Sequence, residues 1–171
     1  SNSTAINRRI APFLCPSDGQ MLASNGGVRL NNYHGSYGVT TDPWLGSGST
    51  GIFAHSISYD VGAVVDGTSN TIMWSEALLG TNAPTRDKRT GVGLSGANAA
   101  ARALDPRVMQ GGVQVLSAGA QSVLQACNDA WAAGIVNGAQ TSPNRGQFWA
   151  IGSPGYTYFN TVVTPNSTQY K

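Results

Sequence analysis

A short segment in the middle of the chain gathers the oxygen donors that a calcium site would need. Asp66, Ser69 and Asn70 offer carboxylate, hydroxyl and amide oxygens within five residues, and Glu76 adds a carboxylate further on. These are the hard ligands that Ca²⁺ prefers, but the acids are spaced unlike those of an EF-hand loop. Short polar side chains beside a glycine, here Gly67, more often hydrogen-bond their own backbone in a turn. We therefore expect a structural turn at this segment and keep calcium binding as the alternative.

Histidine and serine, the usual residues of a hydrolytic site, occur without the spacing that such a site needs. His34 and His55 lie 21 residues apart and form no HxH, HxxxH or HExxH pattern. The serines that stand near glycines never form the GxSxG sequence of a nucleophile elbow. We therefore expect no catalytic residues, no metal site at the histidines and no enzymatic activity.

Cysteine usage leaves two interpretations open. Cys15 and Cys127 are the only cysteines, and neither stands in a CxxC pair. Two cysteines are too few for a disulfide-rich scaffold, and these lack the neighbours of a zinc site. They form either one bridge or two buried thiols, and the redox compartment decides between the two.

Aromatic residues suggest a second kind of binding surface. Flat apolar rings bordered by amide groups are suited to stacking against carbohydrates. Trp44 and Tyr156 lie in predicted loops, so they are the candidates for contact with a carbohydrate or another solute. Trp74 and Trp131 lie in patterned segments and are expected in the core.

Composition bounds the class of protein. The 171 residues suit a single domain spanning residues 1–171, and only 11% of them are charged, against roughly a quarter in ordinary soluble domains. A surface rich in hydroxyl and amide groups suits a protein that packs among copies of itself or lies in the envelope, because little charge repulsion opposes assembly. A loop-rich soluble domain is the alternative interpretation of this composition. The net charge is +2 and the basic residues are scattered, so we expect no nucleic-acid partner.

Local patterns predict both strands and a helix. Residues 28–40 alternate well enough for a strand, and the β-branched and aromatic residues of 71–79 favour a strand at the centre of a sheet. Apolar residues at helical spacing predict a helix over residues 122–133, with Ser122 and Gln125 as a capping box. The fold class expected is α+β, with a mainly antiparallel sheet packed on this helix.

Five short blocks of the sequence resemble, in their order and content, a bacterial family known as domain of unknown function 1559. The resemblance runs from about residue 5 to 168, and the block at 66–76 is its most specific part. The other four blocks are residues 12–18, 32–38, 51–53 and 159–167.

The resemblance implies a pilin-like globular domain outside the cytoplasm. Members of the family look like pseudopilins that begin with a prepilin-type segment and a long apolar helix, which is absent here. We therefore interpret the chain as a fragment of a longer parent that would touch the membrane only through the missing helix. An oxidising compartment favours a Cys15–Cys127 disulfide.

The resulting functional expectation is a non-catalytic structural protein of the cell envelope, periplasm or cell surface. It would be a subunit of a filament or of a pseudopilus such as that of type II secretion. Its partners would be other copies of itself or related pilin-like subunits, and no cofactor is expected apart from the calcium alternative. An extracytoplasmic module that binds a solute or a carbohydrate is the alternative function.

Overall fold

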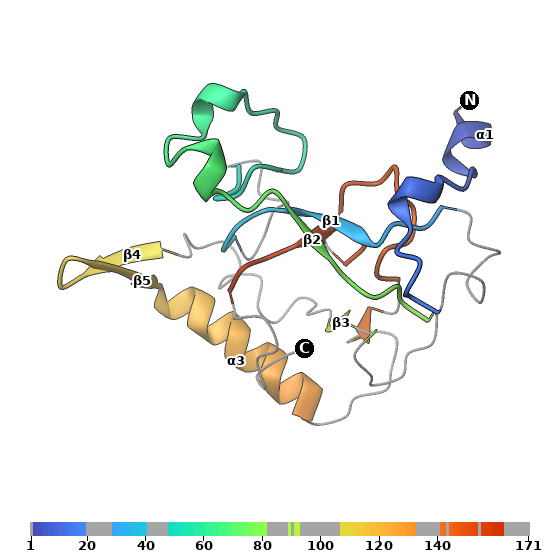
Figure 1. The fold of residues 1–171 in the computed structure, drawn as a ribbon. Helices are drawn as coiled ribbons and strands as arrows, with labels where there is room; N and C mark the ends of the chain where they lie inside the picture. The colour runs from blue at the N-terminus through green and yellow to red at the C-terminus, as the bar shows by residue number, and fades with distance from the viewer. Residues whose placement is uncertain are drawn as a thin grey trace.

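The fold combines short strands with one long helix. The computed structural model describes residues 2–19, 29–40, 48–81, 89, 91–92, 107–132, 141–142, 144–153 and 155–162. Among these, no helix is long and apolar enough to cross a membrane. In chain order the elements are α1 (Ser3–Ile6), the 3₁₀ helix η1 (Ala11–Phe13), β1 (Tyr33–Ser36), the 3₁₀ helices η4 (Val61–Ala63) and η5 (Thr68–Asn70), β2 (Trp74–Glu76), β3 (Gly91–Val92), β4 (Arg107–Gln110), β5 (Val113–Leu116), α3 (Ala118–Ala132), β6 (Thr141–Ser142) and β7 (Tyr158–Phe159) (Figure 1).

A three-stranded mixed sheet lies at the middle of the molecule, in the order β2-β1-β7. β2 runs antiparallel to β1, with Gly35 opposite Trp74, whereas β7 runs parallel to β1, with Gly35 opposite Tyr158. Two antiparallel pairs, β3 with β6 and β4 with β5, complete the described strands. The expected α+β class is therefore observed. α3 packs against β3 and β5.

The position of β2 differs from the sequence expectation. The segment 71–79 was expected at the centre of the sheet, but β2 is an edge strand, and Ile72 and Trp74 are 60% and 51% exposed. The expected core position of Trp74 is therefore wrong, while the side chain of Trp131 lies outside the described residues. β-branched and aromatic residues favour any strand whose side chains find partners, so their presence does not separate an edge from a centre.

β1 takes the central place because its small residues admit aromatic neighbours. His34, Gly35 and Ser36 are buried, and the Phe53 ring lies directly over Gly35. Phe53 in turn contacts Trp74, with ring centroids 4.7 Å apart, and Tyr158, at 6.2 Å. Aromatic side chains from three separate parts of the sequence thus meet around Gly35 of β1.

The helix expected at residues 122–133 is present as α3, but it begins four residues earlier, at Ala118. Its first turn is capped by Ser117, whose Oγ accepts a hydrogen bond from the Ala120 backbone at 3.2 Å. The predicted capping box is therefore wrong, because Gln125 lies inside the helix and donates from Nε2 to Asp129. The spacing of the apolar residues predicted the helix, but the N-terminal cap is Ser117 instead of the predicted Ser122.

A hairpin of β4 and β5 leads directly into α3 and was not anticipated (Figure 1). Its turn is Gly111-Gly112, with φ of 57° and 79°. A two-residue turn with positive φ at both positions matches the right-handed twist of the paired strands and favours glycine. The Gly111-Gly112 pair is the feature of the sequence from which this hairpin could have been predicted.

Many of the buried residues described are polar. Leu14, Leu30 and Leu79 form an apolar cluster among the described residues. Among the described residues, more polar than apolar side chains are buried; the polar ones are Asp18, Asn31, Asn32, His34, Ser36, Thr40, Ser117, Gln147, Ser153 and Thr157. Buried polar groups are tolerated when they are hydrogen-bonded, so the fold depends on specific polar contacts.

The contact of Phe53 with Gly35 generates a first prediction. A Cβ at residue 35 would lie 2.7 Å from the Phe53 ring, so Gly35→Ala should lower the free energy of unfolding by about 1–3 kcal/mol. Gly19→Ala is the matched control, because no atom lies within 4 Å of its Cβ position. Urea denaturation measures both. Equal stability of Gly35→Ala and wild type would contradict the contact, and Phe53→Leu should restore part of the loss.

Candidate functional site

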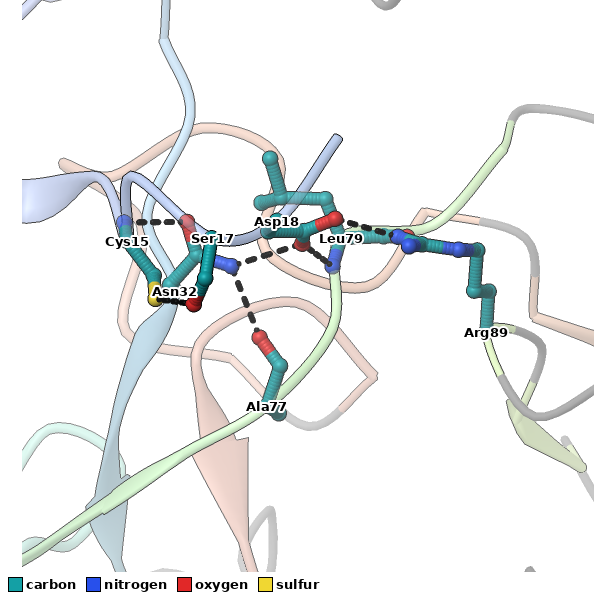
Figure 2. A network of polar contacts seen from close by, with 7 residues as sticks. All are labelled: Cys15, Ser17, Asp18, Asn32, Ala77, Leu79 and Arg89. Atoms are coloured by element: carbon teal, nitrogen blue, oxygen red, sulfur yellow. Dashed lines mark hydrogen bonds and ion pairs between the residues drawn. The ribbon is translucent and has the colours of Figure 1, made fainter. Parts of the chain in front are cut away.

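The most extensive polar site described in the structure is centred on the carboxylate of Asp18, which is 2% exposed. Its Oδ2 accepts hydrogen bonds from the Asn32 side chain and from the Leu79 backbone, each at 2.8 Å. Its Oδ1 accepts from the Arg89 guanidinium at 2.7 Å, an ion pair (Figure 2). A buried carboxylate needs such partners, because desolvation of an unpaired charge is costly.

Asn32 connects this carboxylate to two further segments. Its Oδ1 accepts from the Cys15 backbone and its Nδ2 donates to the Ala77 carbonyl, both at 2.9 Å (Figure 2). Its backbone also donates to Phe13 and accepts from Ala77, each at 2.8 Å. The N-terminal segment, β1 and the strand exit after β2 are therefore joined through one amide.

The contacts of this network hold distant segments of the chain in position. Cys15 Sγ lies 3.0 Å from the hydroxyl of Ser17, and no histidine belongs to the seven residues of the network in Figure 2. The oxygens of Asp18 are already engaged by three donors, including a cation. A carboxylate held in this way fixes the segments around it. Asp18, Asn32 and Arg89 were not predicted as site residues from the sequence, although Asp18 and Asn32 lie in two of the five family-like blocks.

The expected disulfide is not formed, and this corrects the prediction. Cys15 and Cys127 are both free thiols. Cys15 is buried beside Asn32 in the N-terminal segment, whereas Cys127 lies on α3, which packs against β3 and β5. Burial raises the pKa of the Cys127 thiol to about 11, so it stays protonated at neutral pH.

The residues singled out as a turn or calcium site form a turn. Gly67 has φ of 85°, the Asn70 side chain donates to the Asp66 carbonyl at 3.1 Å, and the Asn70 backbone donates to Gly67. Ser69 lies inside η5 and is exposed, and Glu76 lies apart on β2, opposite Tyr33. Within the described part of the chain, no three acidic, histidine or cysteine side chains gather as metal ligands.

Of the two aromatic residues expected to contact a solute, Trp44 lies outside the described residues. Tyr156 is half-buried and contacts Phe148, with ring centroids 5.8 Å apart. The guanidinium of Arg29 lies over the Phe148 ring, 5.4 Å from the centre of that ring. Tyr156 therefore belongs to a packed group of side chains.

The two histidines occupy different environments. His34 is 2% exposed in β1, and its Nε2 has no hydrogen-bond partner among the described residues. Burial, with a smaller contribution from the Arg145 charge, lowers the pKa of His34 from 6.5 to about 4. His34 is therefore neutral at physiological pH. His55 is half-buried, and its Nδ1 lies 3.3 Å from the hydroxyl of the adjacent Ser56.

The Asp18 network generates the second prediction. Asp18→Asn removes the charge that pairs with Arg89 and should lower the free energy of unfolding by about 3–5 kcal/mol, as when one partner of a buried pair is lost. Arg89→Met should also destabilise, and the double variant should lose less than the sum of the two. Asp129→Asn, on the exposed face of α3, is the control and should change stability by less than about 0.5 kcal/mol. Urea denaturation of Asp18→Asn at wild-type stability would contradict a structural role for the network.

His34 generates the third prediction, on pH. The unfolded chain protonates His34 from about pH 6.5 downward, but the folded chain only near pH 4, so acidification favours unfolding across this window. The free energy of unfolding should fall by roughly 3 kcal/mol between these limits from this residue alone. Acidic residues contribute as well, so the measurement is the difference between wild type and His34→Asn in denaturation at pH 7, 5.5 and 4. His55→Asn is the control, and an identical pH dependence in wild type and His34→Asn would refute the assignment.

Comparison with known proteins places the chain in a family without giving it an activity. No curated protein and no solved structure matches the chain. The model of a family described as "Protein of unknown function (DUF1559)" matches residues 1–168, nearly the whole sequence. The resemblance found in the sequence blocks is thereby confirmed, and the chain belongs to the DUF1559 family.

Proposed function

We propose that this chain is a non-catalytic structural protein outside the cytoplasm, a pilin-like or pseudopilin-like subunit of a filament or of a secretion-associated assembly. Membership of DUF1559 supports the proposal through the pseudopilin-like character that the family resemblance implies. The low content of charged residues supports it as well, since neighbouring copies would repel one another little. The α+β architecture is the class expected for a pilin-like globular domain.

The observation that carries the proposal is the exposure of large apolar side chains in one stretch of the chain. Val61 and Val65 are 75% and 88% exposed, and Ile72, Met73 and Trp74 follow at 60%, 43% and 51%. Single exposed apolar residues are ordinary, but several in one segment are typical of a surface that another protein covers. A structural subunit surrounded by other subunits would bury such side chains on assembly.

The test is the location and state of the native gene product, followed with an antibody raised against this chain. Cells of the source organism are treated with formaldehyde and separated into cytoplasm, envelope and material sheared from the surface. We expect the protein in the envelope or the sheared fraction, as a ladder of cross-linked multiples. A cytoplasmic protein, or one that never forms a ladder, would refute the structural role.

The alternative, a solute- or carbohydrate-binding module, has a distinct outcome in the same organism. Such a protein would lie outside the cytoplasm as a monomer. The purified chain would then gain thermal stability with an oligosaccharide, because a ligand bound only to the folded state shifts the melting temperature upward. That pair of results would replace the proposal by the alternative.

A further inference from the structure

One end of the molecule is apolar and acidic. The exposed apolar residues of 61–74 define this acidic lobe together with the exposed carboxylates of Asp60 and Asp66. No lysine or arginine occurs between Arg29 and Arg86, so nothing in that sequence compensates these acids. The lobe carries η4 and η5 and continues into β2 (Figure 1).

The opposite end is apolar and basic. Arg8 and Arg9 are exposed beyond α1, and the Trp149 indole donates to the Arg8 carbonyl at 3.1 Å, which places residues 8–9 beside residues 149–151. Ile151 in this group is 44% exposed. Neither residues 2–17 nor residues 144–162 contain an acidic side chain. We call this group of residues 8–12 and 149–151 the basic end.

The two surfaces lie apart on the molecule. In Figure 1, α1 and the N-terminus are at the upper right, and the lobe with η4 and η5 is at the upper left, beyond the other end of the central sheet. The two surfaces of one chain therefore cannot cover each other. Each has the charge that the other lacks, and each has apolar side chains to bury.

From this complementarity we infer that the acidic lobe of one copy binds the basic end of a second copy, head to tail. The inference rests on the proposed function, which makes other copies the partners, and it adds the surfaces and the symmetry. Two lobes facing each other would bring four carboxylates together, and residues 60–74 contain no lysine or arginine, so a contact of like surfaces is disfavoured. A contact between two different surfaces leaves one acidic lobe and one basic end unoccupied in each dimer. Further copies can therefore bind there, and the contact extends into a row of subunits.

The contact should be weak and sensitive to salt. Its charges are exposed, and at 0.1 M salt the interactions between exposed charges more than about 10 Å apart are largely screened. In sedimentation at low salt, the average mass of the wild-type chain should rise with concentration, and 0.5 M NaCl should reverse most of that rise. A chain that stays monomeric into the millimolar range at low salt would overturn the inference.

A mixing experiment tests the head-to-tail arrangement. Val65→Lys blocks the lobe at a side chain that is 88% exposed, and Arg8→Glu with Arg9→Glu blocks the basic end, so neither change should alter folding. Each variant alone should sediment as a monomer. The two mixed in equal amounts should form a dimer of twice 17.7 kDa and nothing larger, because one intact surface of each kind remains.

Controls separate the possible failures. Ser122→Lys adds the same charge on the exposed side of α3 and should associate as wild type does. Unchanged melting temperatures establish that the variants fold, and Ile72→Lys provides a second lobe variant. If Val65→Lys abolishes association but mixing restores nothing, like surfaces meet and the inference is wrong. If the same variants in the native gene leave the cross-linked ladder intact, the subunit role stands without this contact, whereas a wild-type gene product without a ladder refutes the proposed function itself.

Discussion

The buried carboxylate of Asp18 is the constraint on which the rest of the described structure depends. Its hydrogen-bond donors are Asn32, which directly precedes β1, Leu79, which follows β2, and Arg89, so these distant segments must come together for the charge to be satisfied. Such an ion pair adds little net stability, because desolvation of the two charges offsets most of their attraction. Its effect is selective: a competing arrangement that leaves Asp18 in the interior without these donors is strongly unfavourable.

Asn32 extends the same selectivity to the sheet. Its side chain engages Cys15, Asp18 and Ala77, and its backbone adds bonds to Phe13 and Ala77. Apolar contacts have little directional preference, so the described cluster of Leu14, Leu30 and Leu79 does not by itself specify which segments pair. Hydrogen bonds with defined partners compensate, and they explain how β1 can consist of small and polar residues and still hold the centre of the sheet.

Local signals in the sequence were sufficient for the helix around residues 122–132, for a strand within 28–40 and for the turn at Asp66-Gly67. Features that depend on distant partners could not be found in this way. Asp18 was not singled out from the sequence, because its partners Leu79 and Arg89 follow 61 and 71 residues later. Trp74 was expected in the core because its segment has the composition of a strand, yet coverage of a strand is decided by neighbours that composition does not specify.

Folding and surface recognition use different parts of this chain. The polar contacts that fix the fold involve residues 13–18, 32, 77–79 and 89, whereas most of the large exposed apolar side chains described belong to residues 61–74. The contact of Phe53 with Trp74 is one of those that join the two regions, because Phe53 also lies over Gly35 of the central strand. Side chains of the lobe that point to solvent, such as Val65, can therefore change without disturbing the Asp18 network. A substitution there alters what the surface binds, while a substitution at Asp18 or Asn32 alters whether the surface is presented at all.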